Sequence, residues 1–198
     1  MSKPIPALIL AAGKSERLGE NKGLVDVSGN TLLDVVVERL SSVGCSPIIV
    51  VTRAELAIDY LTASPRCNVV INKSPEDGRT GTVQTGLISL GEELGALPKS
   101  VLIVPVDRPG WEIKTLQKIV DSEGCVCPEK DGRGGHPIKI GQDEISAILT
   151  APSDKPLREI VNPIRFVVED SFLHLNIDTP SDLEELKLWI DESDGLSR

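Results

Sequence analysis

Short apolar runs alternate with segments of helical spacing through the first 130 residues of the chain. Leu32, Leu33, Val36 and Leu40 recur as one face of a helix does, whereas 101–104 is a continuous apolar run typical of a strand buried on both faces. The pattern predicts strands at 5–10, 47–51, 68–71, 101–104 and 124–127, and helices at 31–43, 54–63, 81–90 and 113–121. This alternation predicts a parallel sheet covered by helices on both faces.

The alternation becomes less regular after residue 128. The glycine-rich segment 131–135 predicts a turn between two antiparallel strands, the second of them at 136–140. After it the pattern predicts helices at 143–149 and 155–161, a strand at 164–168, and a last helix that Thr179 or Ser181 caps. We therefore expect one α/β domain over residues 1–198, a mostly parallel twisted sheet in a Rossmann-like three-layer arrangement. Its ligands should bind beyond the carboxyl ends of the strands.

The composition excludes some classes of partner. A net charge of −9 argues against nucleic acid, which usually needs a basic patch. No apolar run is long enough to span a membrane and the start lacks a signal-peptide pattern, so we expect no membrane partner and a cytoplasmic location. The spacing of Cys45, Cys67, Cys125 and Cys127 fits no zinc template, and burial as small apolar side chains is the favoured interpretation. A metal site of Cys125 and Cys127 with His136 is the alternative.

The segment that follows the first predicted strand has the composition of an anion-binding loop. Between residues 10 and 22 it contains two glycines and three cations, namely Gly13, Gly19, Lys14, Arg17 and Lys22. Small residues let backbone N–H groups approach a phosphate, and the cations favour its charge. The loop is not a P-loop, because Leu8 stands where that motif needs its first glycine.

A second candidate site lies at the end of the 101–104 strand. Asp107 stands between Pro105 and Pro109, and the prolines restrict the backbone around it. A rigidly held carboxylate at this edge of the sheet suits Mg²⁺, which takes one or two protein carboxylates and fills its other positions with water and phosphate. The alternative is a helix cap or an ion pair with Arg108.

Asn176 and Asp178 form a third candidate. They alternate about Ile177, so in an extended segment their side chains point the same way and could bind the same cation as Asp107. The alternative is that Asp178 or Thr179 caps the last helix.

Two further segments carry polar chemistry. Residues 78–87 combine glycines and hydroxyls with Arg79 at a predicted helix start, which suits an anion or a base, although an ordinary loop and cap is equally consistent. His136 follows two glycines and is a candidate substrate contact or acid–base group, with a structural role as the favoured interpretation. Phosphate-binding cations with separated metal carboxylates favour phosphoryl or nucleotidyl transfer.

Four ordered motifs resemble a known family. The first loop resembles the L-A-[AG]-G-x-S-x-R-[ML]-G-x-x-K signature of the cytidylyl- and guanylyltransferases that act on molybdopterin. The other three matches are Pro105-Val106-Asp107-Arg108-Pro109, Gly135-His136-Pro137 and the segment from Asn176 to Leu183. Methylerythritol phosphate cytidylyltransferase shares the first loop more loosely.

This resemblance implies a nucleotide-diphospho-sugar-transferase-like fold and a reaction in which a substrate phosphate attacks the α-phosphorus of a nucleoside triphosphate and releases pyrophosphate. By motif, the nucleotide-binding backbone is that of Leu10, Ala11, Ala12 and Gly13. Arg17 and Lys22 would stabilise the triphosphate charge in the transition state. Asp107 would hold Mg²⁺, with Asp178 and Asn176 as candidates to complete the site.

The resemblance also bears on the nucleotide and the acceptor. Arg79 and Thr82 match a segment that frames the base in cytidylyltransferases, with threonine replacing serine. Ala12 is typical of cytidylyl transfer, where guanylyl transfer has glycine, so CTP is favoured over GTP. The chain departs from the pattern of this family at three positions. Asn21 stands where a proline is common, Asp26 where a small or apolar residue is usual, and Lys139 where an apolar or aromatic residue is common. We expect Lys139 near the acceptor pocket, which puts the acceptor in question.

The partners implied are a nucleoside triphosphate and a small phosphorylated acceptor. Molybdopterin cofactor is favoured, with a molybdoenzyme as a further partner that receives the product. Another sugar, polyol or lactate phosphate is an alternative within the same chemistry. A non-catalytic protein that binds a nucleotide or delivers molybdopterin is the alternative from a different class, and the joint presence of Arg17, Lys22 and Asp107 disfavours it.

Overall fold

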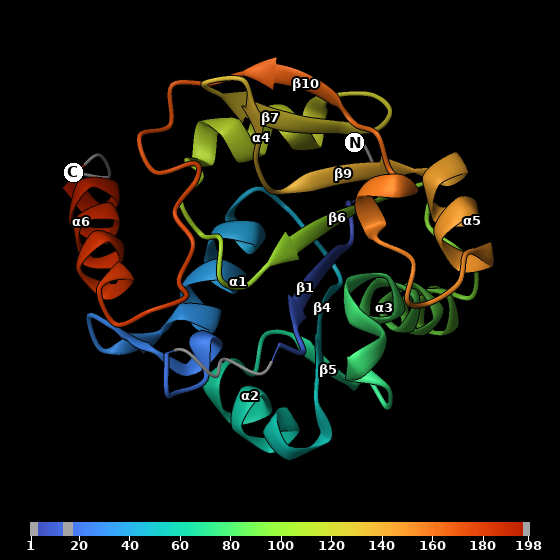
Figure 1. Cartoon of the computed structure of the whole chain (residues 1–198), viewed down its shortest axis with the longest axis horizontal. Helices are drawn as coiled ribbons and strands as arrows, with labels where there is room; N and C mark the ends of the chain where they lie inside the picture. The colour runs from blue at the N-terminus through green and yellow to red at the C-terminus, as the bar shows by residue number, and fades with distance from the viewer. Residues whose placement is uncertain (1–3, 14–17, 196–198) are drawn as a thin grey trace.

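The computed structural model describes residues 4–13 and 18–195, and an eight-stranded sheet forms its centre (Figure 1). Seven strands lie in the order β10-β7-β9-β6-β1-β4-β5, and β8 pairs with β7. Their bounds are β1 (Ala7–Ala11), β4 (Ile48–Thr52), β5 (Asn68–Ile71), β6 (Ser100–Pro105), β7 (Val126–Lys130), β8 (Arg133–Gly134), β9 (Ile138–Gly141) and β10 (Ile164–Val167). A separate two-stranded hairpin consists of β2 (Asp26–Val27) and β3 (Asn30–Thr31).

The helices cover both faces of the sheet. They are α1 (Leu32–Ser42), α2 (Ala57–Ala63), α3 (Gly78–Leu94), α4 (Ile113–Asp121), α5 (Gln142–Thr150) and α6 (Asp182–Gly195). Buried side chains of α1, α2, α4 and α6 share one core with Ile9 of β1, and those of α3 and α5 share the other core with Leu8. Figure 1 shows α3 beside α5, with α6 on the opposite side of the molecule. The predicted α/β fold, mostly parallel with helices on both faces, is confirmed.

The topology brings two loops together at one edge of the sheet. Strand β1 pairs in parallel with β4 on one side and with β6 on the other, and Leu10 is in register with both Val51 and Pro105. The chain runs outward from β1 through β4 to β5 and then returns to β6. The order therefore reverses between β1 and β6, and ligands of open α/β sheets bind at such a point. The loops after Ala11 and Pro105 both begin there.

The second half matches the predicted pattern only in part. Strand β9 is antiparallel to β7, as predicted, and it also pairs with β6 on its other side. Between them the predicted turn contains β8, a two-residue strand that pairs back on β7 and that the pattern did not predict. The predicted helix at 155–161 is only a 3-10 turn at Leu157–Glu159. Helix α3 begins three residues before the predicted start and runs four residues beyond the predicted end. Its Gly86 lies so close to the sheet that a Cβ would be 2.9 Å from side-chain carbons of Leu8 and Val51.

A cation between two tryptophans attaches the C-terminal helix to the rest of the chain. The guanidinium of Arg39 on α1 lies 5.2 Å from the ring centroid of Trp111 and 4.8 Å from that of Trp189 on α6. Its Nη2 also donates to the Trp111 carbonyl at 2.7 Å. Both rings are buried. Stacking of Arg on indole therefore fixes α6, and with it the end of the segment that carries Asp178.

The four cysteines are all buried and free, as predicted from their spacing. Burial raises the pKa of Cys45 and of Cys125 to about 12, so both are neutral thiols at physiological pH. Within the described residues no three His, Cys, Asp or Glu side chains gather as metal ligands would, which leaves the Cys–His metal alternative without support. None of the helices in the described part of the chain is both long and apolar enough to cross a bilayer.

Lys139 has a structural role that the sequence did not predict. It lies in β9, in register with Leu102 and Val126, and its side chain is buried. Its Nζ donates to the carbonyl of Val120 at 2.8 Å and to that of Ser122 at 2.5 Å, at the C-terminal end of α4. Lys139 therefore satisfies two carbonyls that the helix leaves unpaired, and the groove of about 480 Å³ that it also lines contains none of Lys22, Asp107 and Asp178.

Replacing Lys139 by methionine should lower the free energy of unfolding by about 1–3 kcal/mol, because it leaves these buried carbonyls without a donor. Urea unfolding followed by circular dichroism measures the change. Lys99→Met, at an exposed position just before β6, is the matched loss of a lysine and should have little effect. Equal stability of Lys139→Met and the wild type would show that Lys139 does not cap α4.

Candidate active site

Three charged side chains from distant parts of the chain meet at the carboxyl edge of β1 and β6. Lys22 Nζ donates to Asp107 Oδ2 at 2.9 Å and also to Asp178 Oδ1. The two carboxylates are 85 and 156 positions from the lysine in sequence. The side chains of Lys22, Asp107 and Asp178 are 15%, 24% and 27% exposed, so all three are largely buried but still reached by solvent. The structure thus brings together the predicted residues of three separate motifs.

The backbone around Asp107 is tied to the sheet and to the C-terminal segment. The N–H of Val106 donates to the Leu10 carbonyl at 3.1 Å, which extends the β1–β6 pairing beyond Pro105. The Asp107 carbonyl accepts the N–H of Ile177 at 2.9 Å. This second bond places the segment of Asn176 and Asp178 against Asp107. The side-by-side position of the two carboxylates therefore follows from main-chain pairing.

Asp182 holds the backbone of Asp178 in place. One oxygen of the Asp182 carboxylate accepts the N–H groups of Asp178 and Thr179 at 2.8 and 2.6 Å, and the Thr179 hydroxyl at 2.9 Å. The backbone bond to Asp178 is the main reason that the pKa of Asp182 is lowered. The alternative that Thr179 caps the last helix is compatible with these bonds, because its N–H donates to the acidic side chain three residues on, while Asp178 Oδ1 accepts from Lys22. Asn176 Nδ2 donates to the other oxygen of Asp178 at 2.6 Å.

A buried tyrosine fixes the backbone on which Lys22 stands. Asn21 Oδ1 accepts the N–H of Gly23 at 3.1 Å and the hydroxyl of Tyr60 from α2. A Cβ at Gly23 would lie 2.5 Å from a ring carbon of Tyr60, so only glycine fits there. Asn21, which departs from the proline of the resembling family, therefore has a structural explanation. It caps the 3-10 turn Lys22–Leu24.

Lys22 carries its charge at neutral pH. Burial by itself lowers the pKa of the ammonium, but the hydrogen bonds and charges of Asp178 and Asp107 outweigh it and raise the pKa above its usual value. The site therefore presents a fixed positive group between two carboxylates.

A second cluster of cations lies beside these residues. Arg79, in the first turn of α3, is close enough to Asp107 and Arg108 for both charges to influence its pKa. Burial is the largest cause that lowers the pKa of His136, to about 3, and the positive charges of Arg79 and Arg108 lower it as well. His136 is therefore neutral at physiological pH and cannot donate a proton as an imidazolium. Arg108, considered in the sequence only as an ion-pair partner for Asp107, adds a cation to the predicted phosphate site.

This histidine should make the protein acid-sensitive. Between the unfolded pKa of 6.5 and the folded value of about 3, the unfolded chain binds a proton that the folded chain does not, so the free energy of unfolding falls as pH falls through this range. Urea unfolding at pH 7 and pH 5 should show a smaller loss for His136→Gln than for the wild type. His174→Gln controls for the loss of an imidazole, and an unchanged pH dependence in His136→Gln would contradict the assignment.

The remaining residues predicted to contact the nucleotide differ in their hydrogen bonds and in their exposure to solvent. The Ala11 carbonyl accepts the Thr52 hydroxyl at 3.1 Å, while Ala12 and Gly13 follow the strand and are partly and fully exposed. Thr82 is buried, and its hydroxyl donates to the Gly78 carbonyl at 2.8 Å and accepts the Asn72 amide at 3.1 Å. These bonds anchor the start of α3. Arg17 lies outside the described residues, and its role stays a prediction.

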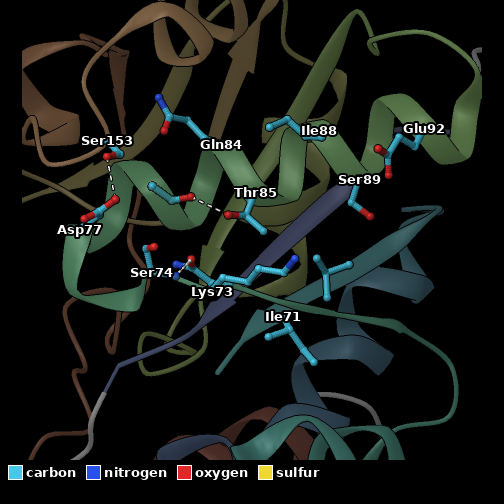
Figure 2. Close-up of a pocket in the computed structure, with 13 residues that line it drawn as sticks. Ile71, Lys73, Ser74, Asp77, Gln84, Thr85, Ile88, Ser89, Glu92 and Ser153 are labelled. Carbon is cyan, nitrogen blue, oxygen red and sulfur yellow. Dashed lines mark hydrogen bonds between the residues drawn. The ribbon is translucent and has the colours of Figure 1, made fainter. Parts of the chain in front are cut away.

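A separate groove of about 510 Å³ runs between β5 and α3 (Figure 2). Its wall is the flank of α3 that carries Gln84, Thr85 and Ile88, with Asp77 just before the helix, and Lys73 extends along it. The Ser153 hydroxyl donates to Asp77 at 2.7 Å, which holds the loop after α5 against the start of α3. None of Lys22, Asp107 and Asp178 lines this groove. The groove is therefore separate from the three charged side chains at the β1–β6 edge.

Sequence reasoning missed the residues that position the site. Tyr60, Asp182 and Arg39 act on the three charged side chains through the backbone or through helix packing. Asp182 had the strongest available signal, since an acidic residue three positions after a threonine is part of a capping pattern.

Comparison with known families accounts for most of the chain. Residues 7–169 match the model of the MobA-like NTP transferase domain. The chain is 26% identical over 188 residues to the molybdenum cofactor cytidylyltransferase of Escherichia coli, covering 90% of this chain and 93% of the relative. It is 31% identical over 160 residues to a probable molybdenum cofactor guanylyltransferase of Trichormus variabilis, covering 80% and 72% of the two chains.

A third relative acts on a different acceptor. It is the 2-C-methyl-D-erythritol 4-phosphate cytidylyltransferase of Rhodococcus opacus, 37% identical over 176 residues, with 84% of this chain and 72% of the relative covered.

Solved structures show the same fold. The crystal structure of Rv0371c from Mycobacterium tuberculosis superposes with a TM-score of 0.78 at 20% identity, over 95% of this chain and 99% of that one. A structure of Rv0371c in complex with manganese gives a TM-score of 0.72 at 18% identity, over 93% and 98% of the two chains. With a family model that covers residues 7–169 and relatives of this similarity, the chain belongs to the MobA-like NTP transferase family and is a nucleotidyltransferase.

Proposed function

We propose that this nucleotidyltransferase transfers CMP from CTP to molybdopterin cofactor with the help of Mg²⁺ and releases pyrophosphate. The observation that carries the proposal is the meeting of Lys22 with Asp107 and Asp178 at the β1–β6 switch point. A cation beside two carboxylates is suited to bind phosphate and a divalent metal in the same recess. We include in the proposal a single nucleotidyltransferase domain over residues 1–198, a cytoplasmic location and a molybdoenzyme that receives the product.

The reaction forms one P–O bond and breaks another. An oxygen of the acceptor phosphate attacks the α-phosphorus of CTP, and the bond from that phosphorus to the oxygen bridging to the β-phosphate breaks. Pyrophosphate leaves with the electron pair of that bond. Lys22 would neutralise charge that develops on the phosphates, together with Arg17. Arg79 and Arg108 would add positive charge from the α3 side. Such reactions gain most of their rate from the stabilisation of charge on the phosphates.

The residues at the site fit a magnesium ion. Asp107 and Asp178 already direct one carboxylate oxygen each at a common cation, and hard oxygen ligands of this kind are those that Mg²⁺ prefers. We therefore assign Asp107 and Asp178 as the residues that would hold it, with Asn176 beside them as a candidate third donor. When bound, Mg²⁺ neutralises phosphate charge on the triphosphate and on the leaving pyrophosphate.

The preference for CTP rests on Ala12 and on the backbone from Leu10 to Gly13. A methyl group at Ala12 narrows the space for a base, which favours a pyrimidine. A thermal-shift panel of CTP, GTP, ATP and UTP with Mg²⁺ tests it, because a ligand that binds only the folded state raises the melting temperature. The largest shift should come with CTP, and Ala12→Gly should raise the shift with GTP. A larger shift with GTP than with CTP in the wild type would overturn the preference.

A second acceptor is supported by one specific observation. The relative with the highest of the three identities, from Rhodococcus opacus, is named for a polyol phosphate. The departure at Lys139 does not decide between the acceptors, since that lysine caps α4. Steady-state kinetics with molybdopterin cofactor and with 2-C-methyl-D-erythritol 4-phosphate would separate them. A kcat/KM higher for the polyol phosphate would replace molybdopterin in the proposal.

A further inference from the structure

Lys22 occupies the position that a metal ion held by both carboxylates would need. Its Nζ contacts Asp107 Oδ2 and Asp178 Oδ1 at once, and those are the oxygens that the two carboxylates direct at a common point. The other oxygen of Asp178 already accepts the amide of Asn176. A divalent cation bridging Asp107 and Asp178 would therefore overlap the ammonium.

The overlap is relieved only when the ammonium moves away from the two carboxylates, because its Nζ contacts both of them. Two positive centres held at the same pair of partly buried carboxylates repel each other strongly. A nucleoside triphosphate offers the ammonium new anionic partners, and because Asn21 and Tyr60 fix the backbone of Lys22, the ammonium would move toward them by rotation of the side chain alone.

We propose that Lys22 is a placeholder cation, which keeps divalent metal out of the Asp107–Asp178 pair until the phosphates of a nucleotide draw the ammonium away. The inference rests on the proposed function, because it takes these two carboxylates as metal ligands. Its consequence is that metal and nucleotide bind with strong positive coupling, and free metal binds weakly. By linkage, the metal strengthens nucleotide binding by the same factor.

The test is a titration with Mn²⁺, followed by electron paramagnetic resonance of the free ion, in the absence of any nucleotide. Lys22→Met and Lys22→Gln remove the ammonium but keep a side chain of similar length. Each should bind Mn²⁺ about tenfold more tightly than the wild type or better, since an uncompensated carboxylate pair gains a cation. Lys114→Met is the matched control, because it removes an exposed lysine that pairs with Glu112 and should leave Mn²⁺ affinity unchanged.

Adding a non-hydrolysable CTP analogue completes the test. The wild type should then bind Mn²⁺ much more tightly, and Lys22→Met should gain less, because no ammonium has to be displaced. Equal or weaker Mn²⁺ binding by both folded Lys22 variants without nucleotide overturns the placeholder role. Failure of the metal assignment looks different. In that case Lys22→Met with Asp107→Asn would retain the tight Mn²⁺ binding of Lys22→Met.

Discussion

Replacing Asp107 by asparagine should leave a folded protein that releases pyrophosphate roughly a thousandfold more slowly than the wild type or not at all. The substitution keeps the shape of the side chain and the bond from the Ile177 N–H to the carbonyl of residue 107, but it removes the charge that pairs with Lys22 and that we assign to the metal. A coupled pyrophosphate assay measures the rate, and circular dichroism checks the fold.

Asp59→Asn on the exposed side of α2 is the matched control for the loss of one carboxylate, and its rate should equal that of the wild type. If Asp107→Asn retains more than about a tenth of the wild-type rate, Asp107 does not bind the metal in the transition state.

Gly110→Ala is expected to have the largest effect on stability, and the protein should fail to fold or lose more than about 4 kcal/mol. A Cβ at this position would lie 1.8 Å from the carbonyl oxygen of Phe172 and 3.0 Å from Leu175 Cβ. The nearest atom belongs to the backbone and cannot turn aside. Because Phe172 begins the approach to Asn176 and Asp178, the change also moves the third segment of the site. Soluble yield and urea unfolding measure the loss.

Gly91→Ala in α3 tests whether any glycine would behave in this way. Its Cβ would meet the end of the Leu97 side chain at 3.3 Å, which is free to move, and alanine favours the helix by about 1 kcal/mol. We expect stability near or above that of the wild type. A Gly110→Ala protein as stable as Gly91→Ala would show that the contact between the 107–112 loop and Phe172 is not held as described.

The parallel half of the fold could be predicted because its signals are local. A continuous apolar run such as 101–104, and repeats such as Leu32, Val36 and Leu40, specify their elements without reference to partners. Loops that follow neighbouring parallel strands must meet at one edge. The convergence of Lys22 and Asp107 was therefore within reach of the sequence, and the structure confirms that they lie together.

The second half could not be predicted to the same degree, because its order depends on pairing between distant segments. Nothing local specifies that β9 enters between β6 and β7 rather than beside β7 alone. The two-residue strands of the β2–β3 hairpin are too short to show an alternating pattern. Lys139 resembled a substrate contact only because its partners at the end of α4 are not visible in the motif around it.

Hydrogen bonds between buried polar groups far apart in the sequence are the other feature that the sequence pattern did not predict. Asp170 is fully buried and accepts the N–H of Glu112 and the hydroxyl of Thr115 at the start of α4, 58 and 55 positions away. It acts as a cap supplied by another segment, and no local pattern predicts such a cap. The candidate chemistry was legible in the sequence, whereas Asp170, Arg39, Tyr60 and Asp182, which hold it in place, were not.

CTP labelled with ³²P at the α-phosphate, incubated with the protein, Mg²⁺ and molybdopterin cofactor, shows whether a nucleoside monophosphate passes to a phosphorylated acceptor. We expect the label to move from CTP to the pterin product, with one pyrophosphate released for each label transferred. With Asp107→Asn we expect neither event. If the label stays in CTP with molybdopterin cofactor and with every other phosphorylated acceptor tried, under conditions where MgCTP binds, the protein does not catalyse this transfer.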